Sequence, residues 1–247
     1  MKTKHLFALA IPMALVAEPV LAHAEVNQPQ EIIMRPRTTP GGQITVFGDL
    51  GILLIPDLDT SIGLGFGGSY GVDDHLEVGV GYDLGFAPSF EAKGTLAVEA
   101  AYGLIEGNLG VAADVSTGYD LLAEGMAPLG LGARVQFRLN DQLAIVSPGH
   151  QLEIALSGDP KPIALGLPVG VAYQASPSIY AFVNTSIGNI SISNSATTFI
   201  FADNLPLQVG AFFSPSNTMD VGAAVTWLDL ENSADTIGFT LAARLHL

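Results

Sequence analysis

Histidine, serine and carboxylate side chains are the first candidates for chemistry, and their spacing forms no familiar catalytic arrangement. The five histidines are His5, His23, His75, His150 and His246. An acyl hydrolase would need a serine activated by a neighbouring base, and no Ser–His pairing follows from these positions. No histidine stands with carboxylates at the spacing of metal ligands. We therefore expect no catalytic residue, no metal and no cofactor.

Two further patterns suggest ligands but have simpler interpretations. Asp57 and Asp59, and later Asp229, Glu231 and Asp235, cluster in predicted loops. They could bind Ca²⁺, although acidic loops are more often merely solvated. The run GLGFGG at 63–68 would cradle a phosphate only if it preceded a helix. It lies inside a predicted strand instead, where close packing explains glycine at alternate positions.

A further set of charged residues lies in segments where apolar residues alternate with small or polar ones. These charges fall on the polar face of each segment, which we interpret as the inner face of a β-barrel. They are Glu77, Asp83, Lys93, Glu99, Asp114, Asp120, Arg134, Arg138, Glu153, Asp220 and Arg244. Such charges could orient permeating solutes or pair with one another in the wall, and both interpretations stay open. The acids outnumber the bases seven to four, which predicts a mild preference for cations.

The segment 61–86 shows the pattern that positions these charges. Its two arms, SIGLGFGGSYG and LEVGVGYDLGF, alternate apolar residues with small or charged ones around the polar connector VDDH. A period of two places alternate side chains on opposite faces of a strand, and a short polar connector suits a hairpin. The arms predict a hairpin with one apolar face.

Ten other segments follow or extend this pattern. We predict twelve strands near 43–55, 61–71, 76–86, 93–104, 108–119, 129–139, 142–156, 163–173, 178–189, 197–213, 218–229 and 236–247; ten or fourteen remain possible. The parity slips at 147–150, which indicates a bulge, and neither face can be assigned at 180–184. Tight turns at 72–75, 105–107, 140–141, 174–177 and 214–217 alternate with longer loops at 56–60, 87–92, 120–128, 157–162, 190–196 and 230–235.

Composition separates this chain from ordinary soluble domains. It is 49% hydrophobic and only 13% charged, with a mean hydropathy of +0.42, yet no apolar run beyond the N-terminus is long enough for a membrane helix. Strands in lipid must satisfy their backbone groups by closing into a barrel. The net charge of −15 argues against nucleic acid as a partner.

The N-terminus predicts export. Lys2 and Lys4 precede an apolar stretch at 6–16, and Ala22-His23-Ala24 resembles a cleavage site, as in a secretory signal peptide. We assign 1–24 to this signal peptide, 25–42 to an irregular proline-containing segment that could plug the barrel, and 43–247 to the barrel. The chain has no cysteine, so no disulfide framework is expected.

Aromatic residues on the apolar face lie near the strand ends, in two bands. We expect an aromatic girdle of Tyr70, Tyr82, Phe86, Tyr102, Tyr119, Phe137, Tyr173, Phe213 and Trp227. Membrane interfaces select this placement, whereas a soluble β-sandwich would bury its aromatic residues in mid-strand.

The last strand alternates hydrophobic residues to the end of the chain, through Leu241, Ala243, Leu245 and Leu247. It resembles the assembly signal of Gram-negative outer-membrane β-barrels, although that family prefers a terminal aromatic residue. The resemblance implies location in the outer membrane and contact with its lipid, with lipopolysaccharide and with the barrel assembly machinery.

These observations predict an all-β protein: a transmembrane, antiparallel, up-and-down barrel of about twelve strands, with short periplasmic turns and both termini periplasmic. The expected function is a passive, porin-like channel for small solutes. A non-conducting structural or adhesion barrel is the first alternative and an outer-membrane barrel enzyme the second. A soluble secreted β-sandwich is the last.

Overall fold

The computed structural model describes residues 28–247 except 159–160, 194–195, 202–204 and 231–232. Its strands are β1 (Ile44–Leu54), β2 (Ser61–Gly71), β3 (Leu76–Ala87), β4 (Thr95–Ile105), β5 (Leu109–Asp120), β6 (Gly125–Met126), β7 (Leu129–Arg138), β8 (Leu143–Pro148), β9 (Leu152–Ile154), β10 (Ile163–Ser176), β11 (Ile179–Ser193), β12 (Ala196–Phe201), β13 (Leu207–Ser216), β14 (Met219–Asp229) and β15 (Ser233–His246). Among the described residues the helical element is η1 (Ile32–Met34), a 3₁₀ turn, and no described helix has the length and apolarity of a membrane span.

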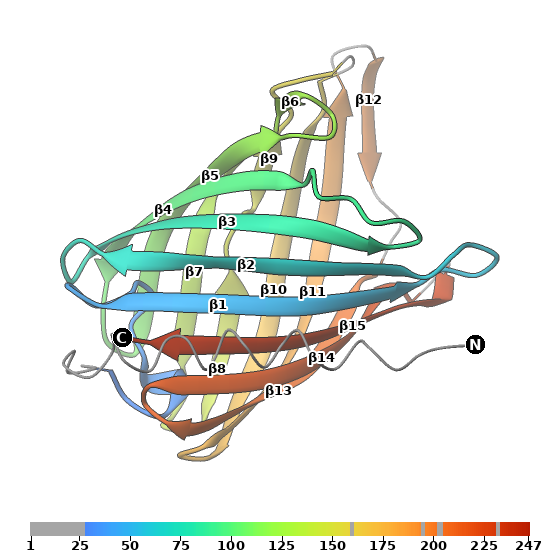
Figure 1. Cartoon of the computed structure of the whole chain (residues 1–247). Coiled ribbons are helices and arrows are strands. Elements are labelled where there is room, and N and C mark those ends of the chain that lie inside the picture. The colour runs from blue at the N-terminus through green and yellow to red at the C-terminus, as the bar shows by residue number, and fades with distance from the viewer. Residues whose placement is uncertain (1–27, 159–160, 194–195, 202–204, 231–232) are drawn as a thin grey trace, which may run out of the picture.

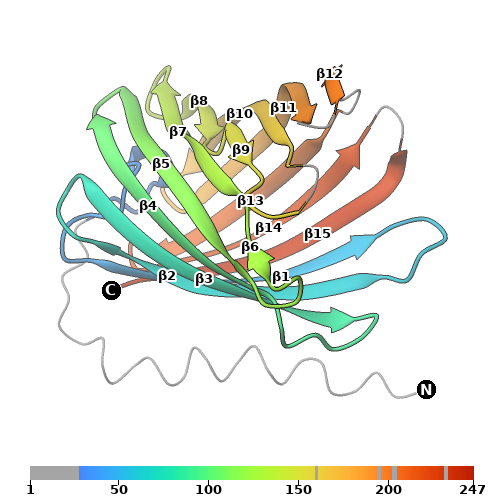
Figure 2. The same cartoon turned by 90° about the horizontal axis from the view of Figure 1, so that it is seen from above.

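The strands form a closed, antiparallel barrel of twelve wall strands (Figures 1 and 2). β8 and β9 are two parts of one wall strand and β12 and β13 of another, while β6 is a short pairing beside β5. Each remaining wall strand pairs with its neighbours in the chain, and β15 pairs with β1. The predicted fold class is therefore confirmed.

The end of the chain completes the closure. Ile44 and Leu247 exchange backbone hydrogen bonds of 2.9 and 2.8 Å, and Leu241 lies opposite Leu50 in the β15–β1 ladder. Closure satisfies the backbone groups that an open edge would expose, so the alternating C-terminal strand is part of the wall up to its last residue.

Burial follows the predicted parity. Outward residues such as Val80, Val98, Leu167 and Leu241 are 48–57% exposed, whereas the inward Ala112 and Ala172 are fully buried. A soluble protein of this size would bury its large apolar side chains. Here the small inward residues are covered and the large outward ones bare, as required of a barrel whose outer face meets lipid.

The ends of several elements differ from the prediction. β4 begins at Thr95, which leaves Lys93 in the preceding connection. A loop was predicted at 190–196, but β11 continues to Ser193 and β12 begins at Ala196. Ser176 pairs with Ile179 and Ser216 with Met219, so the turns are two residues long and begin later than predicted.

The predicted slip near 147–150 is a break between β8 and β9. Gly149 and His150 have φ of 102° and 55°, values that interrupt a strand and favour glycine. The space comes from β7, because a Cβ on Gly132 would meet the backbone nitrogen of Gln151 at 2.9 Å. The chain therefore bends inward there without opening the wall.

Candidate functional site: the lumen and the N-terminal segment

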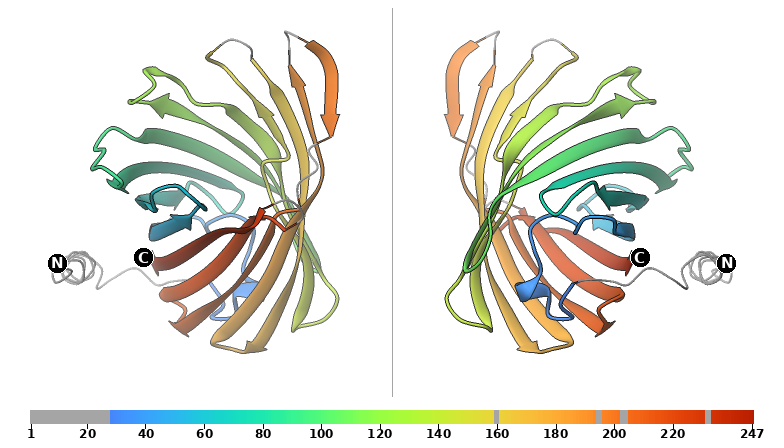
Figure 3. Two further views of the ribbon diagram at one scale, coloured as in Figure 1. Left: turned by 90° about the vertical axis from the view of Figure 1, so that its right-hand side faces the viewer. Right: turned by 90° about the vertical axis from the view of Figure 1, so that its left-hand side faces the viewer.

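The described part of the N-terminal segment, residues 28–42, enters one end of the barrel. This is the end with the tight turns and the C-terminus, here called the tight-turn end, and Figure 3 shows η1 inside the ring of strands. Ile33 is 1% exposed and packs on the inward Ala144 and Ala172. Its N–H donates to Gln174 Oε1 at 3.1 Å, and its carbonyl accepts from Gln136 Nε2 at 2.6 Å. The segment is thus held by both packing and hydrogen bonds.

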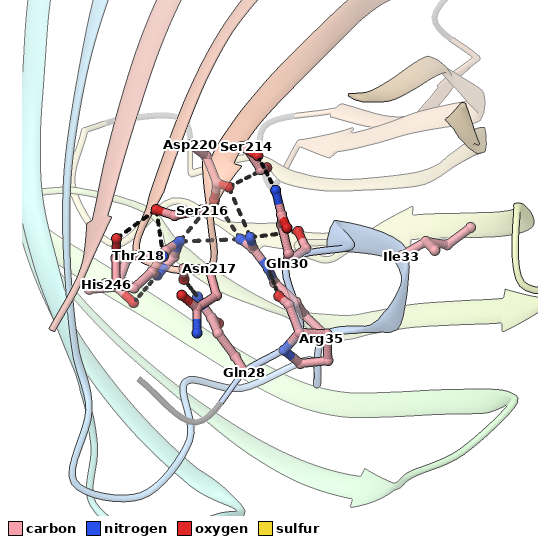
Figure 4. Close-up of polar contacts among 12 residues, drawn as sticks. Gln28, Gln30, Ile33, Arg35, Ser214, Ser216, Asn217, Thr218, Asp220 and His246 are labelled. Carbon is pink, nitrogen blue, oxygen red and sulfur yellow. Dashed lines mark hydrogen bonds and ion pairs between the residues drawn. The ribbon is translucent and has the colours of Figure 1, made fainter. Parts of the chain in front are cut away.

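An ion-pair cluster fastens the segment to β14 and β15 (Figure 4). Arg35 donates to both carboxylate oxygens of Asp220, at 2.5 and 2.9 Å. His246 Nε2 lies 2.8 Å from the same carboxylate and Ser214 Oγ donates to it at 2.5 Å. Asp220 is 0% exposed, and a buried carboxylate requires such partners. The bidentate arginine geometry is the strong form of this pair.

A second cluster holds the other end of the segment. Thr39 donates to Glu77 Oε2 through its backbone N–H at 2.5 Å and its hydroxyl at 2.6 Å. Arg134 contacts Glu77 at 2.9 Å and Glu99 at 3.4 Å. Three of the predicted inward charges therefore form ion pairs beside the segment, two carboxylates sharing one guanidinium.

A third pair lies away from the segment, at the β8–β9 break. Asp114 is 5% exposed, and its carboxylate lies 3.1 Å from His150 Nε2. It also accepts the His150 backbone N–H at 3.3 Å. The inward carboxylate on β5 thus fixes the bend between β8 and β9.

Within the described part of the chain, three lumen arginines have no carboxylate within ion-pair distance. Arg37 donates to the Arg35 carbonyl at 2.6 Å. Arg138 contacts Met34 Sδ at 2.9 Å and Asn108 Oδ1 at 3.5 Å. Arg244 lies over the Phe212 ring, 4.8 Å from its centroid, a cation–π contact. Burial is the main cause that lowers the pKa of Arg37 to about 10, and the positive charges of nearby guanidinium groups lower it as well. Tyr180 acts in the opposite direction and raises this pKa.

The inner wall carries aromatic side chains that the sequence did not reveal. Tyr180, Phe182 and Phe212 form a row with ring centroids 6.2 and 6.1 Å apart. Phe182 rests on the bare backbone of Gly210, where a Cβ would meet its ring at 2.5 Å. These residues made 180–184 impossible to assign, because aromatic rings there occupy the polar face.

The strand register places the predicted lumen residues as follows. Glu77, Asp83, Glu99, Asp114, Arg134, Arg138, Glu153, Asp220 and Arg244 take the inward parity of their strands. Asp120 ends β5 and accepts the backbone N–H groups of Leu122 and Ala123 at 2.8 Å, so it caps a turn. Asp49 also takes the inward parity of β1, and the alternation of residues 44–54 would have identified it.

The predicted aromatic girdle takes the outward parity. Tyr70, Tyr102, Phe137, Tyr173 and Phe213 are 45–50% exposed near the tight turns, and Phe86 and Tyr119 are 38 and 42% exposed toward the other end. Tyr82 packs edge-on against Phe66, and Trp227 lies between Leu207 and Ile237 in the register. In β15, Ala243 and Leu245 share the outward parity of Leu241.

The Ser214, Asp220 and His246 group is not arranged for nucleophilic catalysis. Both Ser214 and His246 contact the carboxylate, and the other histidine nitrogen lies 3.1 Å from Thr45 Oγ1. A triad would require the histidine, not the acid, to receive the serine proton. In the described part of the chain no group of three or more His, Cys, Asp and Glu residues could hold a metal ion.

The barrel is similar to several known structures. The NanC porin superposes with a TM-score of 0.59 at 11% identity, covering 82% of this chain and 100% of that one. The KdgM porin in complex with disordered oligogalacturonate gives 0.54 at 9%, covering 81% and 98%. An outer membrane channel from Pseudomonas putida F1 gives 0.53 at 14%, covering 84% and 96%.

Sequence comparison gives no closer relation, since no family model and no curated protein matches this chain. At these identities the structural likeness is one of fold. The chain has the closed, twelve-stranded antiparallel fold found in outer-membrane porins and channels.

Proposed function

We propose that this protein is an integral outer-membrane barrel that forms a passive channel for small solutes, with the N-terminal segment narrowing its tight-turn end. The observation that carries the proposal is that one folded segment occupies one end of the lumen, held through Arg35 and Thr39. Twelve strands enclose more space than side chains alone fill, and the inner wall is rich in glycine and alanine. The similar structures are described as porins and an outer membrane channel.

The location follows from the outer face. Apolar residues bounded by two aromatic bands suit a bilayer, and we place the tight turns and both termini in the periplasm. Residues 1–24, the proposed signal peptide, lie outside the described residues. The proposed partners are outer-membrane lipid, lipopolysaccharide, the barrel assembly machinery and the permeating solutes.

The proposed ion preference is mildly cationic. Asp49, Asp83 and Glu153 take the inward parity without an arginine within ion-pair distance, whereas the arginines gather around the N-terminal segment. Solutes would therefore meet an acidic section and then a basic one. Selectivity in such a pore depends on which section is narrower.

A non-conducting structural barrel is the second candidate, favoured by the same observation. A segment anchored by the bidentate Arg35–Asp220 pair and by Glu77 could close the lumen permanently. An outer-membrane barrel enzyme is the third, and the contacts of His246 give it little support.

Single-channel conductance in planar bilayers separates these candidates. We expect the refolded mature protein to give small steady currents and the variant lacking 25–42 to give larger ones. Current only after deletion would identify the segment as a plug. Silence from both, with strand content intact by circular dichroism, would contradict the channel and leave the structural barrel.

A further inference from the structure

A cavity of about 360 Å³ lies where the N-terminal segment meets the barrel wall. Ile33, Met34 and Arg37 of the segment form one side, and Ile105, Gly110 and Arg138 of the wall and its adjoining turn form the other. Its volume falls in the range of sites for small ligands. The cavity belongs to both the segment and the wall, so an occupant would touch both.

Two guanidinium groups line this cavity with most of their hydrogen-bonding capacity unused. A guanidinium has five N–H donors. Arg37 donates to one backbone carbonyl, and Arg138 contacts a thioether and, at 3.5 Å, an amide oxygen. A thioether is a weak acceptor. By contrast Arg35 and Arg134, also inside the lumen, are each paired with a carboxylate.

The local charge favours an anion. Arg35, Arg134 and Arg138 surround Arg37 and make its own positive charge less favourable. Asp74 and Glu106 also line the cavity, but both are exposed to solvent, which screens their charges: Asp74 accepts the Gly41 N–H at 3.2 Å, and the Glu106 side chain is 60% exposed, 3.8 Å from His75. Gly110 lets the Arg37 stem lie on β5, because a Cβ there would meet its Cγ at 3.2 Å.

We propose that this cavity binds a small organic carboxylate, whose charged group bridges Arg37 of the N-terminal segment and Arg138 of β7. The planar guanidinium fork matches a carboxylate bidentately. Ile33, Met34 and Ile105, which also line the cavity, provide apolar surface for the body of the ligand. Such a ligand fastens the segment to the wall at a point where the protein itself supplies no ion pair.

The test is calorimetric titration of the refolded mature barrel in detergent, at constant ionic strength, with butyrate, succinate and inorganic phosphate as probes. We expect saturable binding of a carboxylate probe. Arg37→Gln and Arg138→Gln should each weaken it about tenfold or more, since hydrogen bonds to charged groups are among the strongest in proteins. Arg37→Lys, which keeps the charge but loses the fork, should give an intermediate loss.

Arg244→Gln is the matched control, because Arg244 is a lumen arginine that does not line the cavity. Binding should survive this change. Absence of saturable carboxylate binding, binding of phosphate alone, or equal losses in all three glutamine variants would overturn the proposal. Unchanged heat-modifiable migration verifies that each variant is folded. Calorimetry measures binding directly and does not require the barrel to conduct ions. The proposed binding site can therefore be confirmed or rejected independently of the proposed channel function.

Discussion

At the scale of single residues, Asp220 is the central acceptor of the lumen network. It is fully buried and is contacted by Arg35, Ser214 and His246. Removing one partner of a buried ion pair costs about 3–5 kcal/mol, because the other charge remains unpaired. The stability of the N-terminal segment in the lumen therefore depends strongly on this carboxylate.

Arg35→Gln and Asp220→Asn should each release the segment. The chain has no cysteine, so a single Thr38→Cys, at a position 5% exposed, reports release through its rate of maleimide labelling. We expect either substitution to raise that rate about tenfold or more, given the loss of a buried pair. Lys93→Gln, outside the contacts of the segment, is the control. Equal rates in all variants would mean that the segment is held without the ion pair.

The sequence predicts the inward parity of Asp220 but not its partner. Alternation within 218–229 places the carboxylate on the polar face. Arg35 is 185 residues away, in a segment without periodicity. The local alternation of residues determines on which face of its strand a side chain lies. A contact across the lumen depends instead on how the whole barrel closes. The clusters at Asp220 and Glu77 therefore required the structure.

At the scale of elements, glycines on one strand accommodate aromatic rings from the next. A Cβ on Gly222 would meet the Phe212 ring and, at 2.8 Å, the Ala211 carbonyl oxygen. The Gly51 position is open, since its nearest neighbour would be the Gly63 carbonyl oxygen at 4.0 Å. Both residues take the inward parity, which makes them a matched pair.

Gly222→Ala should destabilise the barrel and Gly51→Ala should not. Overpacking of this kind costs about 1–3 kcal/mol, while a substitution into open space changes stability by about 0.5 kcal/mol or less. Urea unfolding in detergent, followed by Trp227 fluorescence, measures both. Equal stabilities would show that the Phe212 ring moves aside freely and that the glycine does not determine its position.

The strands themselves were largely predictable because each alternates over about ten residues. An irregularity at 147–150 was predicted from Pro148 and Gly149, whose backbone preferences are local, but as a bulge and not as the break between β8 and β9. The division between β12 and β13 was not predicted, although Asp203, Asn204 and Pro206 lie between them and are residues that disfavour strands. The faces of 180–184 could not be predicted because Tyr180 and Phe182 belong to a row of aromatic rings on the inner wall, a face that is mostly small or polar in the other strands.

At the scale of the whole molecule, the N-terminal segment should set the ion preference. Its deletion removes Arg35 from Asp220 and Thr39 from Glu77, so both inward carboxylates lose a hydrogen-bond donor. Freed carboxylates attract cations to the lumen. We expect the variant lacking 25–42 to show a stronger cation preference than the full mature chain, measured as reversal potential in a KCl gradient. A shift toward anions would mean that the arginines left in the wall dominate the widened pore.

The outer face makes a further prediction that needs no mutation, since Trp227 is the single tryptophan of the chain. It lies on the outward parity of β14, two residues before the end of that strand. An interfacial indole sits at headgroup depth, with its ring in the apolar region. In vesicles, lipids brominated near the headgroup should quench Trp227 more strongly than lipids brominated near the chain ends. The reverse order would place this end of β14 near the bilayer centre. The end of β14 lies toward the same rim of the barrel as the predicted girdle residues Phe86 and Tyr119. That result would therefore mean that the whole barrel is displaced along the membrane normal and that neither aromatic band lies at an interface.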